Sequence, residues 1–126
     1  MQKRLHLLGS VFFACTAGLV IDGAMAQAWP GKPVRLVVPI APGGSVDTIG
    51  RAMAQKFSEA WKQPVIVENR AGAGGTIGAD VVAKATPDGY TFLINSTSQA
   101  SSAGLYRKLP YDAVKDFAAV TQIITT

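Results

Sequence analysis

Three short apolar runs, each followed by a turn rich in Gly, Ser or Thr, constrain the fold of this sequence most strongly. The runs lie within residues 32–39, 65–67 and 90–94, and helical spacing of apolar residues separates them at 46–62 and 77–84. Strand, helix, strand, helix and strand therefore alternate with short connections. This pattern predicts the α/β class with a parallel sheet.

The first turn, residues 39–47, reads Pro-Ile-Ala-Pro-Gly-Gly-Ser-Val-Asp and joins the first predicted strand to the first predicted helix. A Gly-rich turn at this place leaves backbone N–H groups free at the helix N-terminus. Together with the positive end of the helix dipole, they can bind an anion without a charged side chain. The alternative is a plain helix cap, in which Ser45 or Asp47 satisfies these groups and no ligand is needed.

Two further polar turns, residues 69–76 and 95–99, follow the other predicted strands. Ligands of open parallel sheets bind just outside the carboxyl ends of the strands, so three such turns predict a binding site at that edge. The second turn is not a dinucleotide fingerprint, because Ile77 and Asn95 stand where that motif requires a glycine and an acid. The hydroxyl groups of the third turn can bind a ligand oxygen or cap the turn.

The first 26 residues have the pattern of an export signal. Lys3 and Arg4 precede an apolar stretch, and Ala24 and Ala26 are the small residues that a signal peptidase reads. We expect cleavage after Ala26 and a product in the periplasm. The alternative is an uncleaved membrane anchor, but the apolar stretch is shorter than the ~20 residues of a membrane span.

Cleavage would remove the single Cys and the single His, at positions 15 and 6. The remaining chain then offers no disulfide, no thiolate nucleophile, no Ser-His-Asp triad and no Cys/His zinc site. No catalytic or metal-binding constellation is recognisable, so we expect neither an enzyme nor a cofactor. Its charges are scattered, with Arg107-Lys108 as the only adjacent basic pair after position 26, whereas a nucleic-acid-binding protein normally carries a basic stripe.

Several motifs occur together and in order along residues 27–126. They are WPGKPV (29–34), PIAPGG (39–44) with Asp47 and Arg51, VENR (67–70) with GAGG (72–75) and Ile77-Gly78, PDGY (87–90), and LYRKLPYD (105–112) with KDF (115–117). In these motifs the chain resembles the Bug (TctC-like) family of periplasmic solute-binding proteins of tripartite tricarboxylate transporters. Ile40, Gln99 and Ser102-Ala103 depart from residues common in that family, so the resemblance does not identify the ligand.

The resemblance implies a type II flytrap, a two-lobed α/β protein that binds a small organic carboxylate and delivers it to a membrane permease. It implies a monomer, with residues 27–126 as the N-terminal part of the first lobe, ending near the crossover to a second lobe that is missing. The residues given ligand-loop roles on this basis are Ala41, Pro42, Gly43, Gly44, Ser45, Asp47, Gly74, Gly75, Thr76, Ser96, Thr97 and Ser98.

Two alternatives stay open at this point. The chain could be a truncated, non-functional fragment of such a receptor, since one lobe offers only half of the contacts and would expose apolar surface. The chain could also be an exported hydrolase, although the histidine that usually serves as general base is missing after position 26.

Overall fold

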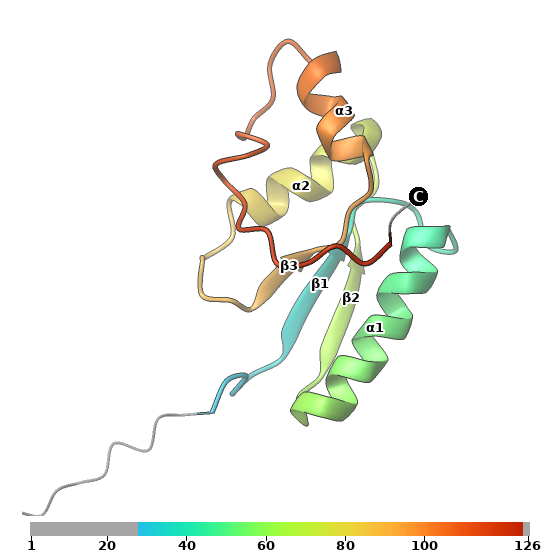
Figure 1. Ribbon diagram of the computed structural model, residues 1–126, viewed down its shortest axis with the longest axis vertical. Helices are drawn as coiled ribbons and strands as arrows, with labels where there is room; N and C mark the ends of the chain where they lie inside the picture. The colour runs from blue at the N-terminus through green and yellow to red at the C-terminus, as the bar shows by residue number, and fades with distance from the viewer. Residues whose placement is uncertain (1–27, 125–126) are drawn as a thin grey trace, which may run out of the picture.

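The computed structural model describes residues 28–124, and the side chains of residues 98–100 and 103 are not described. The predicted signal peptide and its cleavage site therefore lie outside the described residues. The elements, shown in Figure 1, are β1 (Val34–Val38), α1 (Ser45–Trp61), β2 (Val65–Asn69), a 3-10 turn η1 (Ala73–Gly75), α2 (Thr76–Ala83), β3 (Thr91–Leu93) and α3 (Ser98–Leu105). The predicted alternation of strands and helices is confirmed.

The three strands form one parallel sheet in the order β2-β1-β3. In the register, Val38 of β1 lies opposite Asn69 of β2, and Arg35 of β1 lies opposite Thr91 of β3. Since all strands run the same way, their carboxyl ends share one edge, and α1 begins beside that edge (Figure 1). The predicted parallel sheet is therefore confirmed.

β1 is the central strand, and its apolar side chains are buried on both faces of the sheet. Leu36 and Val38 form a core cluster with Ala54 of α1 and with Ile94, which follows β3. Val37 is fully buried and, because side chains alternate along a strand, points to the opposite face. Burial on both faces explains why this strand reads as an apolar run without polar alternation.

α1 lies along β1 and β2 and is bounded by backbone features at both ends. It begins after Gly44, whose backbone is extended, and ends at Lys62, which is left-handed at φ 56° and donates its N–H to the Ser58 carbonyl. Near this C-terminal end, the rings of Phe57 and Trp61 stack at 4.5 Å and Trp29 packs edge-on against Trp61 at 5.0 Å. The aromatic cluster secures the end of α1 that lies away from the predicted ligand edge.

The chain after α3 has no helix or strand between residues 106 and 124. Tyr111 anchors it: the ring is buried and meets Phe117 edge-on at 5.6 Å between centroids. Val114 and Val120 of this segment are exposed, as is Leu105 at the end of α3. Among residues 28–124, no helix is long and apolar enough to cross a membrane.

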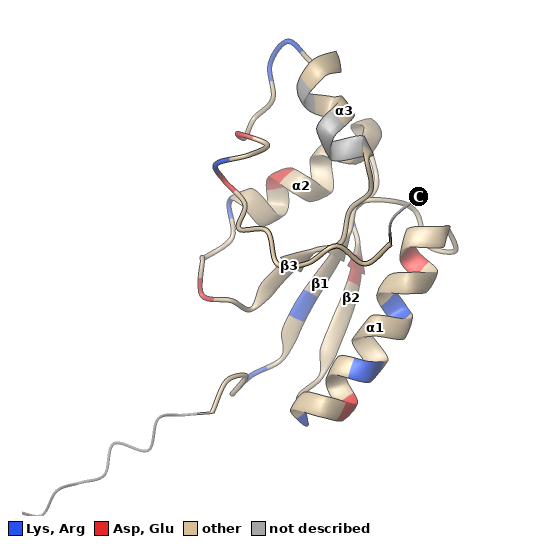
Figure 2. Cartoon of the chain, in the orientation of Figure 1, with Lys and Arg blue, Asp and Glu red and all other residues tan. Residues whose placement is uncertain are grey.

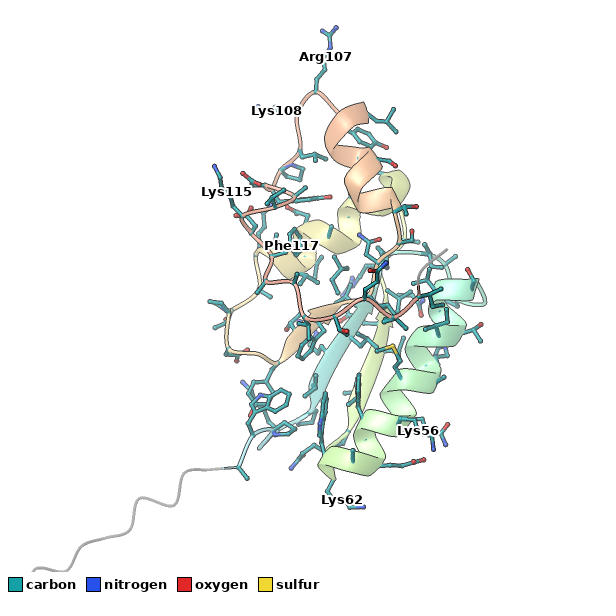
Figure 3. All side chains as sticks on the ribbon, viewed as in Figure 1. Lys56, Lys62, Arg107, Lys108, Lys115 and Phe117 are labelled. Atoms are coloured by element: carbon teal, nitrogen blue, oxygen red, sulfur yellow. The ribbon has the colours of Figure 1, made fainter. Side chains whose placement is uncertain are left out.

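Charged residues are spread over the surface and do not form a stripe. Figure 2 shows acidic and basic positions interspersed on the strands, helices and loops. Arg107 projects at one extremity of the molecule, beyond α3, whereas Lys62 lies at the opposite end, below α1 (Figure 3). The surface of the described residues therefore lacks the concentrated basic footprint of a nucleic-acid-binding protein.

Candidate functional site

Three turns meet the carboxyl edge of the sheet, one after each strand. Residues 39–44 lead into α1, residues 70–75 lead through η1 into α2, and residues 94–97 lead into α3. The first two turns are in contact, since a Cβ on Gly75 would lie 3.5 Å from the Cβ of Pro39. The contact brings together the two turns that carry these predicted ligand residues, and strand direction places the third turn at the same edge.

The first turn leaves the N-terminus of α1 without a side-chain cap. Gly43 is in the left-handed region at φ 89°, which glycine adopts without strain, and Gly44 is the N-cap residue. The first backbone bond inside the helix runs from Thr48 N–H to the Gly44 carbonyl at 2.9 Å. The amides of residues 45–47 precede that bond, so they have no partner within the helix and are the donors that an anion could use.

Asp47 is buried at 3% exposure and is surrounded by donors of the protein itself. Its Oδ2 accepts hydrogen bonds from the Gly43 amide at 2.8 Å and from Arg51 Nε at 3.0 Å. Its Oδ1 accepts one from Asn69 Nδ2 at 2.8 Å. Asp47 therefore holds the turn together through Gly43 rather than capping the first amides of α1.

These contacts hold the Asp47 carboxylate in its ionised form. The Arg51 hydrogen bond, followed by those from the Gly43 amide and Asn69, lowers the pKa of Asp47 from 3.8 to about 2. Each of these donors favours the charged oxygen over the protonated one, and together they outweigh the effect of burial. The negative charge lies in the first turn of α1, where it also favours the helix dipole.

The second turn is held in shape by hydrogen bonds among its own residues. Gly75 N–H donates to the Gly72 carbonyl at 2.9 Å, and Thr76 Oγ1 donates to the Ala73 carbonyl at 2.9 Å. Thr76 is buried, whereas Gly74 is exposed and lies beside the Tyr106 hydroxyl. α2 begins without a side-chain cap, so this turn presents a second helix N-terminus at the same edge of the sheet.

The third turn begins at the buried Ile94 and is exposed at its end. Ser96 and Thr97 are exposed, and α3 begins at Ser98 without a side-chain cap. The Ser96 amide donates to Asn95 Oδ1 at 2.8 Å, and the Thr97 carbonyl accepts from Ser101 Oγ at 3.2 Å. The backbone of this turn is therefore organised locally.

Arg70, at the start of the second turn, is bonded to a carboxylate of the protein itself. Its Nε donates to Glu68 Oε1 at 2.6 Å, and Arg35 Nε donates to Glu68 Oε2 at 3.0 Å. The Arg35 hydrogen bond, with a smaller effect of Arg70, lowers the pKa of Glu68 although burial opposes it. Among the described residues, no group of three or more His, Cys, Asp and Glu side chains is placed to hold a metal ion.

Two surface hollows lie away from the three turns. One, at the opposite edge of the sheet, is lined by Lys32, Arg35, Lys84, Asp88 and their neighbours. The other is apolar and lies between α1 and the final segment, with Met53, Phe57 and Ile123 in its wall. Neither hollow is lined by any of the predicted ligand residues, whose binding role stays a prediction.

Sequence reasoning did not assign site roles to Arg51 and Asn69, which complete the network around Asp47. The spacing of Asp47 and Arg51 is a detectable signal, because residues four apart lie on one face of a helix. Asn69 gave no such signal, since it reaches Asp47 only through the pairing of β2 with β1.

Parallel strands, alternating helices and uncapped helix N-termini at one edge define an open parallel α/β lobe. The solved structure titled periplasmic binding protein BugD has this fold, with 39% identity and a TM-score of 0.68 over 71% of this chain and 30% of that one. MatC from Rhodopseudomonas palustris with bound malate is also 39% identical, with a TM-score of 0.65 over 70% of this chain and 30% of that one. The fold is therefore that of the periplasmic binding proteins.

The particular family follows from the sequence matches. The profile described as tripartite tricarboxylate transporter family receptor matches residues 49–126. Protein BugT of Bordetella pertussis is 38% identical over 125 residues, which are 98% of this chain and 37% of BugT. The chain belongs to the tripartite tricarboxylate transporter receptor family, as its motifs predicted, and spans little more than a third of the length of this relative.

Proposed function

We propose that this chain provides ligand-binding loops of an extracytoplasmic receptor that binds a small organic carboxylate and delivers it to a tripartite tricarboxylate transporter. The observation that carries the proposal is that α1 and α2 both begin without a side-chain cap at the carboxyl edge of the sheet, where the turns that lead into them touch at Pro39 and Gly75. Backbone amides and helix dipoles converge there, which favours a carboxylate. The family match and the malate bound by MatC support the same ligand class.

The remaining parts of the proposal concern the whole receptor. Residues 27–126 would form the N-terminal part of the first lobe, after cleavage of the signal behind Ala26 and release into the periplasm. The receptor would act as a monomer, would hand its ligand to the membrane permease subunits of the transporter, and would not be an enzyme. The likeness to periplasmic binding proteins supports this location and this role.

The proposed ligand residues are those predicted from the sequence. The geometry indicates which of them could use a backbone amide and which a hydroxyl group. Pro42 has no N–H, and the Gly43 amide is already bound to Asp47, so neither supplies a free amide. The donors proposed for the ligand are the amides of residues 45–47 and of Gly74, because the amides of Gly75 and Thr76 donate to the Gly72 and Ala73 carbonyls. The hydroxyl groups of Ser96, Thr97 and Ser98 would add contacts from the third turn.

Two substitutions at Ser45 distinguish the contribution of its amide to ligand binding from the contribution of its hydroxyl group. Proline is tolerated at the first position of a helix, and Gly44, at φ −76° and ψ 168°, has the backbone that a residue before proline prefers. Ser45→Pro therefore deletes one N–H and keeps the helix, whereas Ser45→Ala keeps the N–H and deletes the hydroxyl.

Calorimetric titration with malate, succinate, citrate and benzoate should show saturable binding of at least one of them by the unmodified receptor.

We expect Ser45→Pro to weaken that binding roughly tenfold, the cost of about one hydrogen bond to a charged ligand. Ser45→Ala should stay close to the unmodified receptor. Absence of binding across a wider panel of mono-, di- and tricarboxylates would contradict the proposal. Equal affinities of all three proteins would contradict the use of this amide.

A further inference from the structure

The side chains of Asp47, Arg51 and Asn69 form a closed network that reaches both ends of the first ligand turn. Besides its bond to Asp47, Asn69 Nδ2 donates to the Ile40 carbonyl at 3.1 Å. Arg51 donates from Nη2 to Asn69 Oδ1 at 2.9 Å and from Nε to Asp47. Every side chain of the network therefore bonds to both of the others, and the three come from α1 and the end of β2.

The network attaches the turn at two backbone positions. Asn69 holds the carbonyl of Ile40, where the chain leaves β1, and Asp47 holds the amide of Gly43, just before the helix. The segment between these two points has little freedom, because both of its ends are bonded to side chains of fixed elements. The amides of residues 45–47 follow one residue later, so their direction depends on where the network places Gly43.

The network also neutralises the negative charge of Asp47 beside the proposed anion site. A buried carboxylate beside a proposed carboxylate site would repel the anionic ligand if it were unpaired. Arg51, half exposed at the rim, pairs with it at 3.0 Å and makes the pair neutral. An acid can therefore stay at this position without working against an anionic ligand.

We propose that Asp47 and Asn69 are positioning residues that set the geometry of the first ligand turn and do not themselves contact the ligand. This inference rests on the proposed function and refines it, because it assigns Asp47 to the support of the turn and not to the ligand contacts. Both oxygens of Asp47 are occupied by donors of the protein, and its burial leaves no face for a solute.

Asp47→Asn is the primary test, with Asp88→Asn as its matched control. Both replace a carboxylate that accepts from a cation and a backbone amide, but Asp88 lies at the opposite edge of the sheet, with Lys32 Nζ and the Tyr90 amide as its donors. Asn69→Ala is a second variant. It removes the bonds to Ile40 and Asp47 and keeps the Asp47–Arg51 pair.

Two readouts separate positioning from stability. The first is the affinity for the best-binding carboxylate, malate as the starting probe, in the complete receptor at a temperature where every variant is folded. We expect Asp47→Asn and Asn69→Ala to weaken binding roughly tenfold or more, the cost of one or two misdirected hydrogen bonds, and Asp88→Asn to leave it within twofold. Unchanged affinity in both network variants would overturn the proposal.

The second readout needs no ligand: the hydrogen-exchange rate of the Gly43 amide, measured by NMR. We expect this amide to be protected in the unmodified protein and in Asp88→Asn, and to exchange at least tenfold faster in Asp47→Asn. If no carboxylate binds the unmodified receptor, the proposed function fails, and the Gly43 exchange rate still decides whether the network holds the turn. Equal exchange in Asp47→Asn and the unmodified protein would overturn the proposal.

Discussion

Gly78 of α2 packs so closely on Pro39 that a Cβ at position 78 would lie 2.7 Å from the Cβ of Pro39. The same atom would lie 2.9 Å from the Arg70 carbonyl oxygen. This approach joins the second helix to the first ligand turn through backbone atoms that cannot rotate away. Glycine at position 78 is therefore required by the contact of the two turns.

Gly78→Ala should lower the free energy of unfolding by about 1–3 kcal/mol, the usual cost of overpacking. Gly104→Ala is the control, because position 104 lies in α3 with no atom within 4 Å of its Cβ position. There alanine should be neutral or slightly stabilising, as it favours the helix. Urea unfolding of both variants measures the difference, and equal midpoints would contradict the close approach.

Leu36→Ala should destabilise the protein by about 2–5 kcal/mol, because it leaves a cavity in the core cluster against α1. Ile66→Ala on the edge strand β2 is the comparison, since that side chain is 52% exposed, and its cost should stay below about 1 kcal/mol. Thermal and urea unfolding report both. Similar losses at the two positions would show that the core does not lie between β1 and α1.

Stability should fall on acidification, and the sign follows from two lowered pKa values. The pKa of Asp47 is lowered to about 2 by Arg51, Gly43 and Asn69, and the pKa of Glu68 is lowered chiefly by Arg35. Each contribution is present above the ordinary values of 3.8 and 4.5 and is lost as the pH falls toward the folded pKa. Melting temperatures between pH 6 and pH 2 measure the decline.

Asp47→Asn provides the internal check on this acid dependence. The variant should be less stable than the unmodified protein at pH 6, and the gap should narrow toward pH 2, where the carboxylate of the unmodified protein becomes protonated. Parallel curves with a constant gap would show that Asp47 does not titrate in this window.

Tyr111 should lose its phenolic proton above the ordinary tyrosine value of 10.0, because burial and the nearby Asp80 carboxylate raise its pKa. The folded state favours the neutral phenol, so this contribution is present below pH 10 and is lost as the pH rises. Absorbance titration near the tyrosinate band should show a late phase. That phase should disappear in Tyr111→Phe, which keeps the ring contact with Phe117; its persistence would contradict the assignment.

The order of strands and helices could be predicted because its signals are local. The apolar run of β1 and the helical spacing of Ile49 and Met53 each lie within one segment, and the Gly-rich turns mark the boundaries. α1 begins at Ser45, one position before the expected start at Val46. Parallel pairing then followed from the short connections.

The internal organisation of the site could not be predicted in the same way. Asp47 was expected to bind the ligand or to cap the helix. It does not cap the helix but bonds to the Gly43 amide and to Asn69, and its role toward the ligand stays a prediction. That arrangement depends on the register that sets Asn69 opposite Val38, which no local pattern reveals. The contact between Gly75 and Pro39 likewise exists only after the strands have paired.

The strand order β2-β1-β3 has a consequence for how the chain acquires its structure. β1 can pair with β2 as soon as Asn69 has been added, and α1 is then already available to cover that pair. β3 must wait until Leu93 and has to cross over β1 to reach the other side, which is a slower, less local step. We expect pulsed hydrogen exchange during refolding to protect the β2 amides before those of β3. The first ligand turn would then be formed before the third.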